Sequence, residues 1–355
     1  MRSLRYIGTV LMLLIAFLQG ANAREESETD YKEQQVDVNE IVFGHIGDSY
    51  EWHITDIGDT PIAIPLPVIV KSSTGWHVFL SSRFEEGNGE YEGLYIAKDG
   101  EYKGKIVVKD ASGNEVKPLD ISITKNVTGL FVNSAILVIL VLSCARWYKK
   151  HPVEKEAPKG MVGMMEACIL AINDDVIKGC IGKDYKRYAP YLLTAFFFIL
   201  INNLIGIIPV FPGGANITGN ITITAVLAVC TFLAVNLFAT KAYWKEIFWP
   251  NAPIFLKLPL PIMPFVEFFG VFTKPFALMI RLFANIMAGH TIILALTCLI
   301  FITASMGTAI NGTMTVVSVL FTVFMNCLEL LVACLQAYIF TLLSANYIGL
   351  AKVRE

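Results

Sequence analysis

Charged residues are scarce in this chain of 355 residues, and their scarcity excludes an ordinary soluble protein. Asp, Glu, Lys and Arg together make up 16% of the sequence, whereas hydrophobic residues make up 55%. Soluble domains typically contain about 25% charged residues. The composition therefore predicts a protein that crosses a membrane several times.

No cysteine precedes Cys144, so an exported N-terminal region could not contain a disulfide. The cysteines that follow have no metal-ligand spacing, and buried cysteine usually packs as a small hydrophobic residue. Motifs for a nucleophile, a nucleotide-binding loop or a metal cluster are also missing from the sequence. We therefore expect no phosphoryl chemistry, no metal and no cofactor on this chain.

Residues 1–23 have the pattern of a cleavable secretory signal. They contain two arginines, continue with an apolar core and end at Ala21-Asn22-Ala23. Cleavage would leave Arg24 as the first residue, on the outer side of the membrane. A helix that stays uncleaved as an anchor is the alternative interpretation.

Residues 24–128 form an acidic region, with 20 acidic and 10 basic side chains. Its charged start is expected to be disordered. Short apolar runs separated by Gly, Asn and Asp then predict a small β-rich exported region. The spacing of His45, His53 and His77 is irregular, which favours solvated or packed histidines over a metal site.

Residues 129–355 predict an all-α polytopic membrane domain, with 16 basic and 10 acidic side chains. Lysines after the first apolar run place its far end in the cytoplasm. We expect five spans, an interfacial amphipathic helix over 160–182, an outer N-terminus and a cytoplasmic C-terminus. The last two spans form a long tilted hairpin. The expected spans cover residues 130–147, 188–210, 221–240, 265–302 and 313–350.

One cation lies deep within the fourth of these spans. Arg281 cannot lose its charge, and a charged group at bilayer depth costs at least about 2.5 kcal/mol, so we expect a functional role. At about 100° per residue, Arg281 shares a helix face with small residues that would let another helix approach closely. His290 points to the opposite side, roughly 13 Å farther along the axis. The small residues are Ala277, Ala284 and Ala288.

A second polar pair, Glu329 and Gln336, lies two helical turns apart in the last span. In an antiparallel hairpin, residues that face each other have position numbers with a nearly constant sum. Arg281 paired with Gln336 satisfies this condition, and the same register faces His290 with Glu329. The midpoint falls within Met306–Gly312, which has turn chemistry. The sequence therefore predicts an Arg/Gln level and a His/Glu level in one hairpin.

These residues lie in stretches that resemble subunit a of F-type ATP synthases. The resemblance covers about residues 130–350 and rests on NNLIGIIP, FVEFFGVFTKPFALMIRLFAN, RLFANIMAGH and LQAYIFTLLSANYI. It implies a non-catalytic stator subunit in a bacterial inner membrane, with two offset proton half-channels to and from the carboxylates of a rotor. The implied partners are the oligomeric rotor ring, the peripheral stalk, other membrane-sector subunits and lipid, without nucleic acid. The N-terminal region is longer than is common in this family.

The resemblance implies that the polar residues of the hairpin move protons. Arg281 would favour ionisation of each passing rotor carboxylate and repel a proton that crosses directly. Gln336 would orient its guanidinium, and His290 with Glu329 would form a relay. Asn285 belongs to the same set, one turn beyond Arg281.

Two further residues have both a functional and a structural interpretation. By resemblance, Asn203 would serve the outer proton pathway, although such an amide can simply join two helices. Glu267 would serve the inner half-channel, or it would form a local salt bridge with Lys274, two turns away.

Two other classes of function compete with the rotary interpretation. An ion-coupled secondary transporter would predict inverted repeats and broken helices in corresponding halves, and the sequence has neither. A membrane-anchored sensor or scaffold would not need four polar residues in mutual register. The coupling ion, H⁺ or Na⁺, is left open because the ligands on the rotor are not part of this chain.

Overall fold

The computed structural model describes residues 47–57, 60–84, 87, 89–110, 113–151, 157–208, 213–249, 262–304 and 307–352. The predicted signal segment, the charged start of the acidic N-terminal region and His45 lie outside these residues. So do three prolines of the entry to the long hairpin, at positions 253, 259 and 261.

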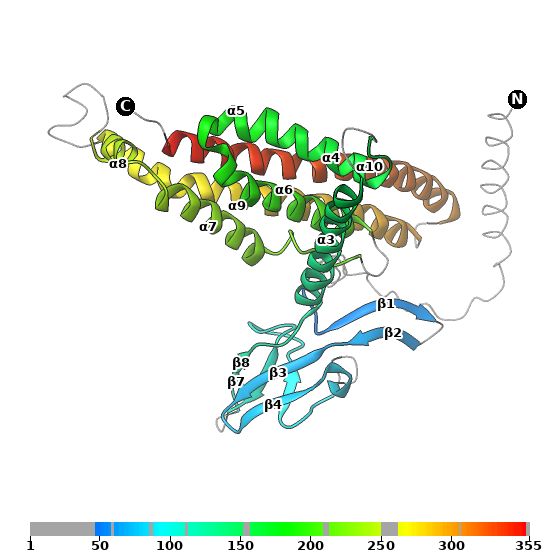
Figure 1. Cartoon of the computed structure of the whole chain (residues 1–355). Coiled ribbons are helices and arrows are strands. Elements are labelled where there is room, and N and C mark those ends of the chain that lie inside the picture. Colours follow the sequence, from blue (N-terminus) through cyan, green and yellow to red (C-terminus); the bar gives the residue numbers. More distant parts are fainter. Residues whose placement is uncertain are drawn as a thin grey trace, which may run out of the picture. The chain divides into compact units, whose positions relative to one another are not determined.

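The described part of the membrane domain is mostly helical (Figure 1). Two of its turns are set by local chemistry. Asn220 begins α7 by accepting a hydrogen bond from Thr222 N at 2.9 Å. Gly307, with φ of 99°, allows the turn before α10. The helices are α3 (Lys125–Lys150), α4 (Met161–Leu170), α5 (Lys178–Ile181), α6 (Tyr185–Ile207), α7 (Ile221–Leu237), α8 (Lys241–Phe248), α9 (Ile262–Thr303) and α10 (Thr308–Ala351).

Four helices of the described chain are long and apolar enough to cross a membrane, and a fifth span results if the bent α7–α8 pair is counted as one. This confirms the predicted polytopic fold with its long closing hairpin. The bend between α7 and α8 measures 101°. The four spans are Lys125–Lys150, Met161–Ile207, Met263–Thr303 and Thr308–Ala351.

Two predicted spans extend beyond the ends of the helices in the structure. The second span ends at Ile207 rather than Val210, because residue 209 is a proline, which disfavours helical geometry in the residue before it. The third span ends at Leu237 rather than Thr240. Thr240 begins the next helix instead, since its hydroxyl accepts a hydrogen bond from Tyr243 N at 3.4 Å.

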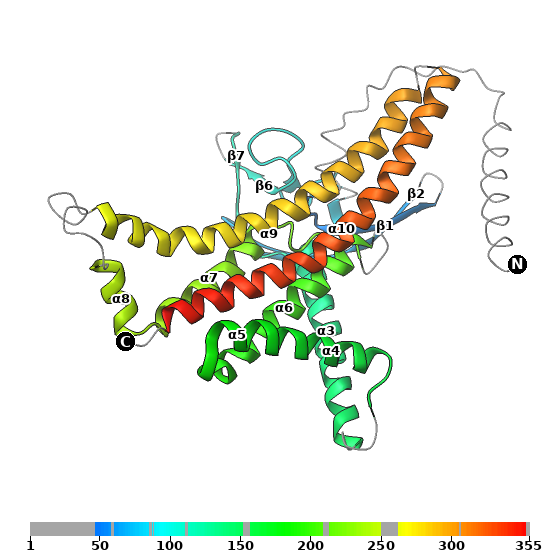
Figure 2. The ribbon, with the colours of Figure 1, turned by 90° about the horizontal axis from the view of Figure 1, so that it is seen from above.

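The α9–α10 hairpin turns earlier than predicted, and α10 begins at Thr308 rather than Thr313. Asn311 and Gly312, which were predicted to form the turn, lie in the first turns of α10. The Thr303 hydroxyl donates a hydrogen bond to Asn311 Oδ1 at 3.2 Å, so that Asn311 stabilises the turn from within the helix. Figure 2 shows the two helices running antiparallel beside each other.

The segment that was predicted to be an interfacial helix is helical throughout, with a π-helical part at Ala171–Ile177. Its inner side joins the main hydrophobic core through Ile172, Val176 and Ile177. At the end of this segment, α5 packs directly against α10. The backbones approach so closely that a Cβ at Gly349 would lie 2.2 Å from the carbonyl oxygen of Cys180.

The N-terminal region is β-rich, as predicted, and its described residues form three small antiparallel sheets with the strand orders β1–β2, β4–β3–β8 and β5–β6–β7. The strands are β1 (Glu51–Ile57), β2 (Thr60–Pro65), β3 (Pro67–Ser72), β4 (Gly75–Leu80), β5 (Leu94–Ile96), β6 (Ile106–Lys109), β7 (Glu115–Val116) and β8 (Leu119–Asp120).

The second and third sheets share a small hydrophobic core that encloses one tyrosine. Val68 and Phe84 are fully buried in it. The Tyr50 hydroxyl donates to Asp120 Oδ2 at 2.5 Å and accepts from Ile106 N at 3.4 Å. Burial, and then the hydrogen bond to the Asp120 carboxylate, raise the pKa of Tyr50 well above its ordinary value.

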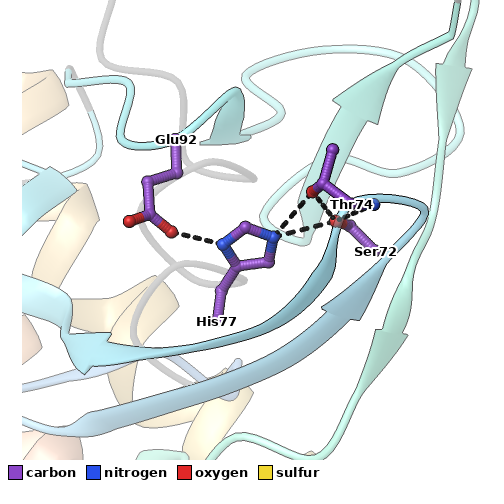
Figure 3. Close-up of polar contacts among 4 residues, drawn as sticks. All are labelled: Ser72, Thr74, His77 and Glu92. Atoms are coloured by element: carbon purple, nitrogen blue, oxygen red, sulfur yellow. Dashed lines mark hydrogen bonds and ion pairs between the residues drawn. The ribbon is translucent and has the colours of Figure 1, made fainter.

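His77 links the β3–β4 turn to the turn that precedes β5 (Figure 3). Its Nδ1 atom forms an ion-pair contact with Glu92. Its Nε2 atom lies 2.9 Å from Ser72 Oγ and 2.8 Å from Thr74 Oγ1. Both ring nitrogens are therefore engaged within the sheet region, as expected for a packed histidine.

Candidate functional site

Arg281 lies on a face of α9 that the described chain leaves uncovered. Arg281 is exposed, and so are the small residues of the predicted stripe. Leu278 and Leu282, on the other side of α9, are buried in the main core with residues of α6, α7 and α10. The exposed residues beside Arg281 are Ala277, Ala284, Asn285 and Ala288.

The guanidinium of Arg281 has no ion-pair or hydrogen-bond partner among the described residues. An arginine stays cationic in a protein. A cation that no described carboxylate pairs with, on an exposed face lined with small residues, is available to an anionic group that packs closely against this face.

His290 and Glu329 meet inside the hairpin, as the register predicted. Nδ1 of His290, on α9, lies 3.0 Å from Oε1 of Glu329, on α10. The Glu329 side chain is only 3% exposed, whereas that of His290 is 18% exposed. The two atoms lack the angle of a hydrogen bond, but their separation is within the reach of proton transfer after a small side-chain rotation.

Gly289 allows this pair to form. A Cβ at this position would lie 2.9 Å from Glu329 Oε1 and 3.2 Å from its Cδ. Any larger residue would therefore push the carboxylate away from where it contacts His290. Sequence reasoning missed Gly289, although a glycine next to a membrane histidine is a visible signal of close helix packing.

Gln336 is buried on α10, two turns from Glu329 and close to the buried Ala333 and Ala337. The predicted direct contact with Arg281 is not formed, since no hydrogen bond joins the two side chains within the described helices. At this level of the hairpin, Arg281 lies on the exposed face of α9, whereas Gln336 is buried in the interior.

Asn203 connects three parts of the chain. Its Oδ1 accepts a hydrogen bond from Thr218 Oγ1 at 2.7 Å, and its Nδ2 donates to the carbonyl of Ala333 at 3.2 Å. Ala333 lies one turn from Glu329 on α10. The structure therefore brings Asn203 close to the helix turn that carries Glu329.

Asn202, the neighbouring amide, has a different environment. Its Oδ1 accepts a hydrogen bond from Asn133 Nδ2 at 3.0 Å, which joins α6 to α3. Its Nδ2 donates to the carbonyl of Phe198 in its own helix. Asn202 thus connects helices, as such amides in membrane spans often do.

The local salt bridge between Glu267 and Lys274 is not formed. Lys274 lies over the ring of Tyr347, with 5.8 Å between its Nζ and the ring centroid. Glu267 is half-buried, and no ion pair joins it to Lys274 in the described part of α9. The structural alternative for Glu267 therefore loses its main support.

The loop between α6 and α7 completes the site, and sequence reasoning missed it. Thr218 contacts Asn203, and Asn216 Nδ2 lies 3.7 Å from the sulfur of Met287 on α9. Both loop residues are buried. Buried Asn and Thr in a loop give no periodic signal, so only their contacts reveal them.

Two family profiles match this chain. The family described as ATP synthase A chain matches residues 130–349. A family described as a domain of unknown function, DUF8433, matches residues 41–125. The matches separate the helical membrane domain from the β-rich region that precedes it.

Curated relatives agree with the first match. The protein named ATP synthase subunit a from Chloroherpeton thalassium is 44% identical over 246 residues, covering 68% of this chain and 70% of that protein. One of the same name from Pelodictyon phaeoclathratiforme is 46% identical over 242 residues, covering 67% of each chain. One from Anaeromyxobacter dehalogenans is 37% identical over 259 residues, covering 70% of this chain and 63% of that protein. The chain therefore belongs to the ATP synthase A chain family, that of subunit a of the F-type ATP synthases.

Proposed function

We propose that this chain is the proton-translocating stator subunit of its ATP synthase. It would supply two offset half-channels that lead to and from the carboxylates of a rotor ring. The observation that carries the proposal is Arg281, a cation that no described residue pairs with, on a face of α9 that the described chain leaves uncovered, together with the His290–Glu329 contact inside the hairpin. The family supports the coarser role of a membrane subunit in the complex.

Arg281 would act through its permanent charge. A positive group close to a rotor carboxylate favours the ionised form of that carboxylate, so a proton is released as the carboxylate passes. The same charge repels a proton that attempts to cross between the half-channels. Lysine would serve poorly, because a buried ammonium can lose its proton.

The outer half-channel would pass along the interior of the hairpin. His290 and Glu329 lie within reach of proton exchange, and Asn203 contacts the backbone one turn from Glu329. Gln336, two turns from Glu329, would place a neutral amide at the level of Arg281, so the charge of the guanidinium would not be neutralised. Asn285 on the open face and the half-buried Glu267 are the candidates for the inner half-channel.

The rotor ring would pack against the exposed small residues around Arg281, because short side chains allow close helix approach. Peripheral-stalk and other membrane-sector subunits would be further partners. The chain would lie in a bacterial inner membrane with its β-rich region in the periplasm and its C-terminus in the cytoplasm. Lysines at one end of the helices support this orientation: they are Lys149, Lys150, Lys241, Lys245 and Lys352.

Replacing the arginine tests the proposal. Arg281→Ala should assemble but abolish ATP synthesis driven by an imposed proton gradient in membrane vesicles, and Arg281→Lys should restore little of it. Thr297→Ala is the matched control, since Thr297 is also exposed on α9 but its hydroxyl bonds only to its own helix. Normal coupling in Arg281→Ala vesicles would contradict the proposed function.

A further inference from the structure

We propose that the β1–β2 hairpin of the N-terminal region is a positioning element of the outer half-channel. Through Trp52 it fixes the loop between α6 and α7, so that Thr218 stays bonded to Asn203. This inference rests on the function proposed above. It gives a role to a segment of the chain that matches a domain family of unknown function.

Trp52 is buried although its sheet has only two strands. A two-stranded hairpin has no core of its own and is marginally stable alone. Trp52 is nevertheless only 3% exposed, because it packs with Ala215 and Ile217 of the α6–α7 loop. The residues that surround this cluster are Ile64 of β2, Leu130 of α3 and Ile223 of α7.

The loop presents opposite sides to the hairpin and to the membrane helices. Ala215 and Ile217 belong to the same buried cluster as Trp52, whereas Asn216 and Thr218 contact the membrane helices. The Asn216 amide lies against Met287, and the Thr218 hydroxyl donates to Asn203. Tight turns fix this arrangement, because Ile217 N donates to the carbonyl of Ala215 at 2.9 Å and Gly219 N donates to Asn216 Oδ1 at 2.9 Å. Packing of Trp52 on one side thus holds the polar side chains against the helices on the other.

The start of α3 ties the hairpin and the loop together. Lys125 N donates to the carbonyl of Ser49 at 2.8 Å, and Asn126 N donates to Asp48 Oδ1 at 3.0 Å, just before β1. One turn later, a Cβ at Gly129 would lie 2.7 Å from the Cβ of Ala215. The hairpin, the helix start and the loop therefore form one packed unit.

The contacts of the loop lead to the helix turns next to His290 and Glu329. Met287, against Asn216, lies one turn before His290 on α9. Ala333, bonded to Asn203, lies one turn after Glu329 on α10. Trp52 would act by holding the loop that contacts these turns.

The test compares two tryptophans of the same region. Passive proton conduction is measured in vesicles that carry the assembled complex after removal of the catalytic sector. Trp52→Ala should lower conduction roughly threefold or more, the size expected for a residue that acts through a packed network. Trp52→Phe should restore most of it. Trp76→Ala, at a site 57% exposed on β4, should leave conduction unchanged.

A double variant separates positioning from general destabilisation. If Trp52 acts through Thr218, then Trp52→Ala combined with Thr218→Val should conduct no worse than Thr218→Val alone. Wild-type conduction in assembled Trp52→Ala complexes, or additive losses in the double variant, would overturn the inference. If Trp52→Ala does not assemble, the same cycle is run with Trp52→Leu, and additive losses there would again overturn the inference.

Arg281→Ala, assayed in vesicles that still carry the catalytic sector, distinguishes the proposed function from the role of the hairpin. If Arg281→Ala retains coupled ATP synthesis, the proposed function itself fails. If Arg281→Ala loses coupling while Trp52→Ala and Trp76→Ala behave alike, only the role of the hairpin fails.

Discussion

Nδ1 of His290 lies 3.0 Å from Oε1 of Glu329, across the interface of α9 and α10. The contact joins an imidazole on α9 to a carboxylate on α10. Because Glu329 is buried and His290 is partly exposed, a proton could enter through the imidazole and continue to the carboxylate. The chemistry belongs to the pair, so which helix carries the acid should matter little.

Exchanging the two residues tests this idea. His290→Ala or Glu329→Gln should each lower passive proton conduction by roughly 10²-fold, the lower range for a positioned proton-transfer group. The double variant His290→Glu/Glu329→His should retain most of the conduction, because the acid and the imidazole still meet. If the exchange conducts no better than the single variants, the orientation of the pair is essential and the relay must be revised.

Gly289 offers a test that leaves both titratable residues in place. In Gly289→Ala the new methyl group would collide with the Glu329 carboxylate, 2.9 Å away, and displace it from His290. Conduction should fall although the complex assembles. Gly270→Ala is the matched control, because a Cβ at Gly270 on the same helix would have open space around it. Equal conduction in both variants would mean that the contact is not used.

The hairpin was predictable because its geometry follows from helical periodicity. The positions of four polar residues were enough to set the register, and His290 and Glu329 meet as that register requires. The turn was misplaced because Asn311 and Gly312 have turn propensity, yet Asn311 is hydrogen-bonded to Thr303 from inside the helix. The hydrogen bond between Thr303 and Asn311 therefore outweighed the local turn propensity of Asn311.

The outer part of the site was not predictable in the same way. Trp52 and Thr218 are far apart in sequence, and nothing periodic connects them. Their relation depends on how the β1–β2 hairpin packs on a loop, which composition and spacing do not encode. Conversely, the sequence singled out Asn203 as a candidate residue, and its two hydrogen bonds show what it connects.

The two adjacent amides of α6 should respond differently to substitution. Asn133→Ala would leave Asn202 Oδ1 unpaired and lower the stability of the complex by about 1 kcal/mol. Replacing Asn133 and Asn202 together by leucine should recover much of that loss.

Passive conduction below the unfolding temperature should stay near wild type in these variants but fall in Asn203→Leu. Thermal unfolding in detergent, compared with conduction in vesicles, separates the two roles. A conduction loss in Asn133→Ala that matches Asn203→Leu would show that Asn202 also belongs to the pathway.

Because of Tyr50, the free energy of unfolding of the β-rich region should decrease at alkaline pH. Its folded pKa is raised, chiefly by burial, so folding favours the neutral phenol. That contribution is fully present below about pH 10, the ordinary tyrosine pKa, and is lost as the pH rises toward the raised value.

At neutral pH, Tyr50→Phe should cost about 1 kcal/mol, because it removes the hydrogen bonds to Asp120 and Ile106 N. The difference in proteolytic resistance between wild type and variant should therefore shrink above pH 10. Tyr102→Phe is the control, since the Tyr102 hydroxyl has no hydrogen bond within the described region. A constant difference from pH 8 to 11 would show that the phenol does not titrate with unfolding.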